Sequence, residues 1–233
     1  MGTLLISGSR TGLGRGIAEH FARSGWQVFG CSRSEPDWNA DGYRHAIVDV
    51  GHARDVHTWL RRVDRECGGL DAVIANAALI PTPRLAALGI DEAFADVLRT
   101  NVLGAAAVMS SAAAVMLRRK RGRILALSSF ATVALQPGTA QYAASKAAVE
   151  IFAKVLAGEL GSSGVTCNVI APSVYESPGL EAIGPAGHDA ALSGLAIPRP
   201  LRLAEVVASI EYLLSDGAAA VTGQVLRFGT IRS

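Results

Sequence analysis

Tyr142 and Lys146 lie four residues apart, and Ser129 lies thirteen residues before the tyrosine. Four residues advance an α-helix by about 400°, so the Tyr and Lys side chains emerge from one face about 40° apart. A phenol with its ordinary pKa of about 10 is a poor proton donor or acceptor at neutral pH. A lysine cation beside it favours the phenolate, and a nearby hydroxyl can hold a substrate oxygen. The three residues predict proton transfer on a carbonyl or an alcohol.

A glycine-rich turn stands at the start of the chain. The β-prone run Thr3–Ile6 is followed by Gly8, Gly12 and Gly14, and then by an amphipathic helical pattern. Free N–H groups and the dipole at a helix N-terminus attract anions, and glycines let the backbone approach a pyrophosphate. The spacing is G-x-x-x-G-x-G, not the G-x-G-x-x-G of the usual dinucleotide fingerprint. The pattern also fits an ordinary strand–helix turn, but its position favours nucleotide binding.

The end of the second expected strand, residues 27–31, predicts which dinucleotide binds. An acidic residue there binds a free ribose 2′-hydroxyl, whereas an arginine accommodates a 2′-phosphate. This chain has Ser32 and Arg33 at that point and no carboxylate before Glu35. Ser32 can hydrogen-bond a phosphate, Arg33 can pair with it, and Arg10 can assist from the glycine turn. NADP(H) is therefore expected rather than NAD(H), unless Arg33 is only a solvated loop residue.

Taken together, the glycine turn and the set of Ser129, Tyr142 and Lys146 resemble the short-chain dehydrogenase/reductase family over nearly the whole chain. The resemblance implies hydride transfer between a nicotinamide cofactor and a carbonyl or alcohol. It implies that Tyr142 donates the proton, that Ser129 positions the carbonyl oxygen and that Lys146 binds the nicotinamide ribose. Asn101 falls where the family keeps an asparagine that holds a proton-relay water.

Further segments resemble the family's cofactor contacts. Asp49-Val50 resembles its adenine-contacting segment, and Ala75–Ala78 resembles its Asn-Asn-Ala-Gly segment with alanine at both ends. Asn168–Pro172 resembles its Asn-x-x-x-Pro-Gly segment, with Ser173 in place of glycine, and Ser177 falls where a threonine often binds the nicotinamide amide. The predicted cofactor-binding residues are Gly8, Ser9, Arg10, Gly12, Leu13, Gly14, Ser32, Arg33, Asp49, Val50, Asn76, Ala77, Tyr142, Lys146, Pro172, Ser173, Val174 and Ser177.

Three departures from the family pattern affect the expected pocket. Ala78 and Ser173 replace glycines that pass close to the cofactor, so a slightly tighter nicotinamide pocket is expected. The C-terminus reads Leu226–Thr230 where the family often has Asp-Gly-Gly. That change is expected to alter subunit contacts or the floor of the substrate pocket. None of the three removes a catalytic group.

The elements that must position these residues alternate between strand and helix. Strands are expected near residues 3–7, 27–31, 44–48, 70–75, 122–128, 165–170 and 222–227, and helices near 13–24, 53–66, 91–118, 140–161 and 203–215. Such alternation predicts an α/β fold: one Rossmann-like, doubly wound domain over residues 1–233, whose seven-stranded parallel sheet has the order 3-2-1-4-5-6-7 and helices on both faces. A Pro- and Gly-rich stretch at about 174–200 breaks the alternation and is expected to form a substrate lid.

Composition excludes several other classes. The chain has 233 residues, half of them hydrophobic, and a formal net charge of +2, so no broad basic field argues for nucleic acid. Its three cysteines are scattered and fit free thiols in a reducing cytoplasm, and His52 and His57 lack neighbouring metal ligands. The apolar stretch Val102–Leu117 is expected to be too short and too alanine-rich to span a membrane.

Two features concern protein partners. The expected helices near 91–118 and 140–161 carry many small residues, and in the family these helices commonly form a four-helix contact, which implies a homodimer or homotetramer. The basic run Arg118–Arg121 follows the first of them. It either ends the helix as a solvated cap or binds an acidic partner such as an acyl carrier protein.

The predicted function is NADPH-dependent reduction of a ketone to a secondary alcohol. The substrate is either a β-ketoacyl thioester or a free ketone of specialised metabolism. One alternative is an NAD(P)-dependent alcohol or diol dehydrogenase that works oxidatively, against which Arg33 argues. Another is a non-catalytic NADP-binding regulator, which would have no need of the intact set Asn101, Ser129, Tyr142 and Lys146.

Overall fold

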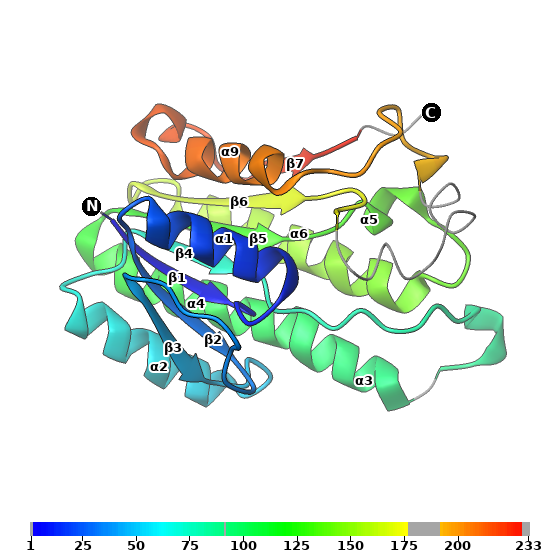
Figure 1. Cartoon of the computed structure of the whole chain (residues 1–233), viewed down its shortest axis with the longest axis horizontal. Coiled ribbons are helices and arrows are strands. Elements are labelled where there is room, and N and C mark those ends of the chain that lie inside the picture. The colour runs from blue at the N-terminus through cyan, green and yellow to red at the C-terminus, as the bar shows by residue number, and fades with distance from the viewer. Residues whose placement is uncertain (1, 91, 177–191, 230–233) are drawn as a thin grey trace.

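A computed structural model describes residues 2–90, 92–176 and 192–229. Seven strands form one sheet in the order β3-β2-β1-β4-β5-β6-β7, and every neighbouring pair is parallel (Figure 1). The predicted fold class and strand order are confirmed. The strands are β1 Thr3–Ser7, β2 Gln27–Ser32, β3 Tyr43–Ile47, β4 Ala72–Ala75, β5 Gly122–Leu127, β6 Val165–Ala171 and β7 Val225–Arg227.

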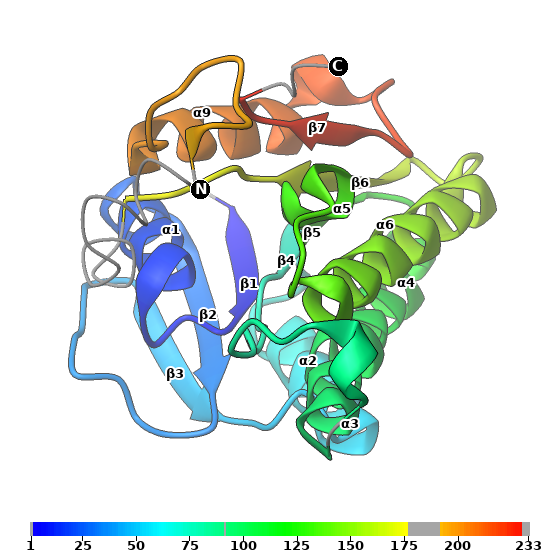
Figure 2. The same ribbon diagram turned by 90° about the vertical axis from the view of Figure 1, so that its right-hand side faces the viewer.

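Helices cover both faces of the sheet (Figure 2). Alternate residues of a strand point to opposite faces, so Leu4 and Ile6 of β1 join one apolar core while Leu5 joins the other. The first core is covered by α1 (Gly12–Arg23) and α9 (Leu203–Leu214), whose buried apolar residues pack together on it. The second is covered by α2 (Ala53–Glu66), α4 (Ala105–Arg119) and α6 (Ala140–Leu160).

The helix expected near 91–118 has an irregular middle. It consists of α3 (Glu92–Leu98), a π-helical turn at Arg99–Gly104 and α4. This continuous helix, Glu92–Arg119, has 28 residues and a mean hydropathy of 1.6 in its most apolar window, and 56% of that window is buried inside the protein. This helix is therefore longer than the stretch Val102–Leu117, which was expected to be too short to span a membrane. Within the described residues it is the one helix long and apolar enough for a span, and its burial is that of a core helix.

Two strands begin later than expected: β4 begins at Ala72 and β7 at Val225. Gly223, with φ 70°, falls within the expected strand 222–227 and ends its extended conformation there. Beside Gly223, side chains add to the backbone hydrogen bonds that continue to β6: Thr222 Oγ1 accepts from the Cys167 N–H at 3.1 Å, and Asn168 Oδ1 accepts from the Gln224 N–H at 3.0 Å. Three short helices were not predicted, namely η1 Ala86–Leu88, α5 Ala131–Ala134 and η3 Asp216–Ala218.

The two ends of the expected lid are joined to each other. Val174 accepts a hydrogen bond from the Leu201 N–H at 2.8 Å, and Leu201 accepts one from the Glu176 N–H at 3.1 Å. Residues 177–191, and Ser177 with them, lie outside the described residues, so the lid itself stays a prediction.

Candidate active site

The main cavity of the described chain lies at the carboxyl ends of the strands and has a volume of about 640 Å³. Most predicted site residues line it: Gly8, Arg10, Gly12, Leu13, Gly14, Ser32, Arg33, Asp49, Val50, Asn76, Ala77, Ser129, Tyr142, Lys146, Pro172, Ser173 and Val174. Ser9 and Asn101 do not line it, because both side chains are fully buried beneath its walls. Most of the predicted residues thus surround one cleft, and the side chains of Ser9 and Asn101 lie behind its wall.

The glycine turn is built to hold an anion. Gly8 and Gly12 have φ of 72° and 60°, which favours glycine, and a Cβ on Gly14 would lie 2.2 Å from the Gly8 carbonyl oxygen. The first turn of α1 contains no acidic residue, and Thr11 at its N-cap makes no side-chain capping bond. The first N–H groups of this helix are thus left for a ligand in the cleft. These features fit the pyrophosphate of a dinucleotide.

Asn76 fixes the glycine turn from the next strand. Its Nδ2 donates to the carbonyl oxygens of Ser7 at 2.9 Å and of Gly8 at 3.0 Å. The N–H groups of Asn76 and Ala77 both donate to Ser7 Oγ at 3.1 Å. The Nδ2 group of Asn76 is thereby used within the protein, and the residue shapes the pocket wall; its contact with a cofactor stays a prediction.

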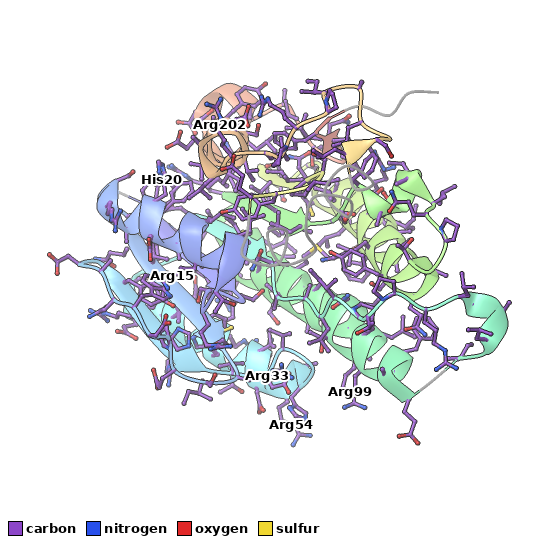
Figure 3. All side chains as sticks on the ribbon, turned by 45° about the vertical axis from the view of Figure 1, so that its right-hand side comes forward. Arg15, His20, Arg33, Arg54, Arg99 and Arg202 are labelled. Carbon is purple, nitrogen blue, oxygen red and sulfur yellow. The ribbon has the colours of Figure 1, made fainter. Side chains whose placement is uncertain are left out.

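The far end of the cleft carries cationic and hydroxyl groups. Arg33 follows β2 and is exposed, with no ion pair found for it among the described residues (Figure 3). Ser32 beside it is half-buried, and both line the cleft. Asp49 accepts a hydrogen bond from the Gly51 N–H at 2.9 Å. The tip of β2 itself bears no carboxylate that would repel a 2′-phosphate.

Lys146 and Tyr142 of α6 meet at the centre of the cleft. Lys146 is buried; its Nζ donates to the Leu127 carbonyl at 2.8 Å and lies 5.8 Å from the centroid of the Tyr142 ring. Burial lowers the pKa of Lys146 to about 8. Burial raises the pKa of Tyr142, and a hydrogen bond with Ser129 acts in the opposite direction.

These pKa shifts correct one expectation. The sequence suggested that Lys146 lowers the pKa of Tyr142, whereas burial is the larger influence on the phenol and Ser129 is the group that opposes it. Tyr142 therefore keeps its proton at neutral pH, hydrogen-bonded to a serine hydroxyl. Even a weakly acidic phenol can give its proton to an alkoxide, because an alcohol is a far weaker acid than a phenol.

Asn101 acts as a clamp. From the π-helical turn, its Nδ2 donates to the Leu79 carbonyl at 2.9 Å and to Ser145 Oγ at 3.0 Å, while its Oδ1 accepts from the Leu79 N–H at 2.7 Å. Ser145 in turn donates to the Tyr142 carbonyl at 2.7 Å. Both donors of the amide are thus used within the protein, and the relay water expected from the family resemblance stays a prediction. The amide joins the loop after β4 to α6, the helix that carries Tyr142 and Lys146.

Comparisons with known proteins fit this geometry. Residues 8–228 match the family model described as enoyl-(acyl carrier protein) reductase. The chain belongs to the short-chain dehydrogenase/reductase family. Among its relatives are the 3-oxoacyl-(acyl carrier protein) reductases FabG of Vibrio cholerae and Escherichia coli, each 28% identical over 228 residues, which cover 95% of this chain and 93% of theirs.

Two further comparisons extend the match. An uncharacterized oxidoreductase of Myxococcus xanthus is 37% identical over 184 residues, which cover 75% of this chain and 72% of its own. The solved structure of ElxO with NADP bound has the same fold, with a TM-score of 0.90, 23% identity and 97% of each chain covered. The sequence-based family assignment is thus confirmed: this chain is a short-chain dehydrogenase/reductase.

In this short-chain dehydrogenase/reductase, sequence reasoning missed a buried ion pair behind Ser129. Glu150 of α6 accepts hydrogen bonds from Ser128 Oγ at 2.7 Å and Thr132 Oγ1 at 3.0 Å, and Arg227 of β7 donates to its other oxygen at 2.5 Å. Ser128 and Thr132 flank Ser129, so the pair holds the segment that carries the Ser129 hydroxyl. The one available signal was the unusual C-terminus around Arg227.

Replacing Arg227 with methionine should lower both stability and turnover. The change leaves Glu150 as a buried, unpaired carboxylate, and we expect a loss of about 1–3 kcal/mol in the free energy of unfolding. Turnover should fall while the dissociation constant for NADPH stays unchanged, because only the Ser129 segment shifts. Urea unfolding and initial rates measure the two effects.

The matched control is the double variant Glu150→Met/Arg227→Met. It removes both charges, so most of the lost stability should return, whereas turnover should stay low because Ser128 and Thr132 have lost their acceptor. Full recovery of turnover in the double variant would contradict the positioning role.

Proposed function

We propose that this chain is an NADPH-dependent ketoreductase that reduces a ketone to a secondary alcohol. The observation that carries the proposal is that Ser129, Tyr142 and Lys146 line one cleft, with the buried Lys146 Nζ 5.8 Å from the centroid of the Tyr142 ring. The cofactor is NADP(H): the uncapped start of α1 suits its pyrophosphate, and Arg33 suits its 2′-phosphate. The name of the similar structure, ElxO with NADP bound, supports this choice.

Each residue has a separate task in this reaction. Bound NADPH supplies the hydride. Ser129 holds the carbonyl oxygen, and Tyr142 gives that oxygen a proton as negative charge develops on it. Lys146 holds the nicotinamide ribose, and Asn101 keeps the catalytic helix in place from behind.

The proposed substrate is a 3-oxoacyl thioester, as the names of the FabG relatives suggest. Exposed apolar side chains beside the catalytic residues suit an acyl chain: Ile80 lines the cleft, and Leu135 follows α5 just after Ser129. A free ketone of similar polarity is the second candidate, since nothing in the cleft demands a thioester.

We propose that an acyl carrier protein, if it delivers the substrate, docks at a surface other than the basic run Arg118–Arg121. Arg118 pairs with Asp64 at 3.2 Å, and Arg119 donates to the Leu70 carbonyl at 3.2 Å. The run ends α4 just before β5 begins, whereas the cleft lies where β5 ends. Six residues of strand separate the two by about 20 Å. The basic run thus lies where β5 begins, at the edge of the sheet opposite the cleft.

The function is tested by following NADPH oxidation with 3-oxoacyl thioesters, free ketones and 2-enoyl thioesters. Reduction of either ketone class, lost in Tyr142→Phe, supports the proposal and identifies the substrate class. Reduction of enoyl thioesters alone would replace it with the reaction that the family description names. Tight NADPH binding without turnover of any of the three would favour the regulator.

Replacing Arg33 with alanine should weaken NADPH binding by about 10- to 100-fold and NADH binding less than twofold, because only NADPH carries the phosphate that the guanidinium would pair. Fluorescence titration measures both dissociation constants. Arg54→Ala is the control, because Arg54 is exposed at the start of α2 but does not line the cleft (Figure 3). Equal losses for the two cofactors would exclude the phosphate role.

We further propose a homodimer or homotetramer that pairs through α6 and α4. On α6, Ile151, Phe152 and Val155 are exposed although they are large and apolar. Val155→Glu should therefore yield a monomer in light scattering, whereas Tyr212→Glu, an exposed position on α9, should not. Unchanged mass in Val155→Glu would refute the contact. A cytoplasmic location goes with this proposal, since the three free cysteines suit a reducing compartment.

A further inference from the structure

A chain of hydrogen bonds runs beneath the cleft from the glycine turn to the tip of β2. Ser9 Oγ lies 2.8 Å from the Tyr43 hydroxyl, which lies 2.6 Å from Nδ1 of His45. Nε2 of His45 lies 3.1 Å from Ser32 Oγ, and Ser32 Oγ donates to the Ser34 carbonyl at 2.5 Å. Ser32 and Ser34 line the cleft, while Tyr43 and His45 stand behind them.

The direction of every bond follows from the last one. Ser32 has a single hydroxyl hydrogen, and the short bond to the Ser34 carbonyl uses it. Ser32 Oγ must therefore accept from Nε2–H of His45. The pKa of His45 is lowered, chiefly by burial, so the ring is neutral and its Nδ1 is an acceptor. Tyr43 thus donates to Nδ1, and Ser9 donates to Tyr43.

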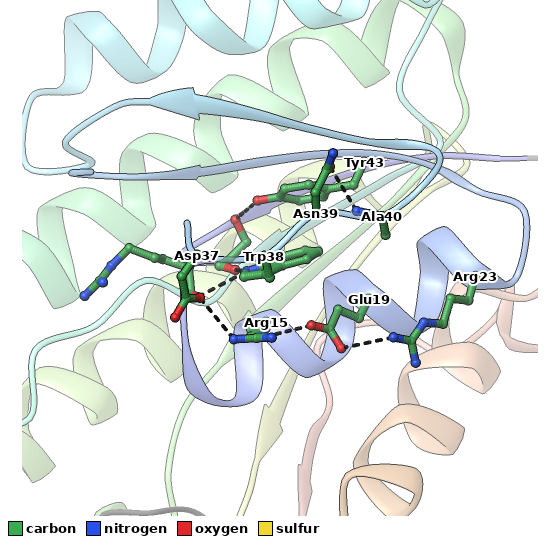
Figure 4. Close-up of polar contacts among 10 residues, drawn as sticks. Arg15, Glu19, Arg23, Asp37, Trp38, Asn39, Ala40 and Tyr43 are labelled. Atoms are coloured by element: carbon green, nitrogen blue, oxygen red, sulfur yellow. Dashed lines mark hydrogen bonds and ion pairs between the residues drawn. The ribbon is translucent and has the colours of Figure 1, made fainter. Parts of the chain in front are cut away.

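The chain of hydrogen bonds is held in a rigid frame. The Trp38 ring packs on Tyr43 with centroids 4.1 Å apart, and its Nε1 donates to the carbonyls of Ser9 at 3.2 Å and Arg10 at 3.1 Å. Arg15 of α1 pairs with Asp37 at 3.1 Å and so ties the same loop to the helix (Figure 4). The loop after β2 and the glycine turn therefore form one unit, with His45 pointing from β3 to Ser32.

We propose that His45 is a positioning residue that sets the preference for NADP(H) over NAD(H) by aiming Ser32 at the adenosine 2′-phosphate. The inference rests on the proposed use of NADP(H). A phosphate dianion only accepts hydrogen bonds, so it needs donors at its site. Ser32 Oγ accepts the hydrogen bond from Nε2–H of His45, so the hydroxyl hydrogen of Ser32 points away from His45. It points toward the Ser34 carbonyl, or toward a phosphate oxygen that takes the place of that carbonyl. Donation from His45 also polarises the serine hydroxyl and strengthens it as a donor. NADH lacks the 2′-phosphate, so its affinity does not depend on this hydrogen bond.

The test compares His45→Leu, Ser32→Ala and the double variant. Dissociation constants are measured for NADPH and NADH by fluorescence and for adenosine 2′,5′-bisphosphate by calorimetry. His45→Leu should weaken NADPH and the bisphosphate on the order of tenfold, leave NADH within twofold, and add no further loss in the Ser32→Ala background. Tyr43→Phe keeps the packing on Trp38 but frees Nδ1, so it should weaken NADPH by a smaller factor.

Several results would overturn the inference. Equal weakening of NADPH and NADH would mean that His45 only supports the edge strand. A full tenfold loss on adding His45→Leu to the Ser32→Ala variant would mean that His45 acts without Ser32. Unchanged NADPH binding in the single variant His45→Leu would mean that His45 does not act on the cofactor. Binding is measured without a ketone, so a failure to find a substrate leaves this result intact and counts only against the proposed reaction.

Discussion

Replacing Tyr142 with phenylalanine is expected to lower kcat about a thousandfold while leaving the dissociation constant of NADPH unchanged. The change removes one oxygen, the hydroxyl that is proposed to give a proton to the substrate oxygen beside Ser129. The ring keeps its packing, and the glycine turn and Arg33 are untouched, so cofactor binding should persist. Initial rates and fluorescence titration of the same preparation measure both quantities.

A matched control is Tyr212→Phe, which makes the same chemical change on the exposed face of α9. Its turnover should equal that of the original protein. Residual turnover above about a tenth in Tyr142→Phe would assign the proton to another donor, and the next group to test would be the hydroxyl of Ser129.

Replacing Lys146 with methionine is expected to lower kcat at least about a hundredfold and to change how stability depends on pH. Burial lowers the Lys146 pKa from 10.5 to about 8. Below pH 8 the lysine is charged in both the folded and unfolded states, so the cost of burying the charge is fully present. Between pH 8 and 10.5 the unfolded chain binds more protons, and the free energy of unfolding therefore rises with pH.

The rise attributable to Lys146 amounts to about 3 kcal/mol in total. Methionine does not titrate. The unfolding free energy of the original protein minus that of the variant should therefore rise by about this amount from pH 8 to 10.5. Urea unfolding of both proteins without cofactor at several pH values isolates the contribution, since all other groups titrate equally in the two. Parallel curves would show that Lys146 is not buried as described.

The sequence was sufficient for the sheet, the strand order and the position of the cleft. These depend on local patterns: apolar runs, glycines at a strand–helix junction, and two side chains four residues apart on α6. The placement of Tyr142, Lys146 and the glycine turn at one cleft was predictable because the residues of each motif are neighbours in sequence.

The supports behind the cleft were not predictable, because they join distant parts of the chain. Glu150 meets Arg227 across 77 positions, and Asn101 meets Ser145 across 44. Ser9 was expected to contact the cofactor, yet its hydroxyl faces Tyr43 beneath the turn. A pattern of residue types does not show whether a hydroxyl points into the cleft or into the protein interior behind it. The pKa of Tyr142 was misjudged for the same reason, since burial depends on the whole fold.

The π-helical turn at Arg99–Gly104 amounts to one surplus residue within an otherwise regular helix. Deleting one residue there would restore a plain α-helix and leave α3 and α4 in nearly the same orientation, because about five residues of α-helix turn as far as six residues of π-helix. Only the residues of the turn itself would change direction, so Asn101 would leave Leu79 and Ser145 while both flanking helices keep their packing. The surplus residue thus serves to aim one side chain, and a one-residue deletion within Arg99–Gly104 should cost the Asn101 contacts more than it costs the helix.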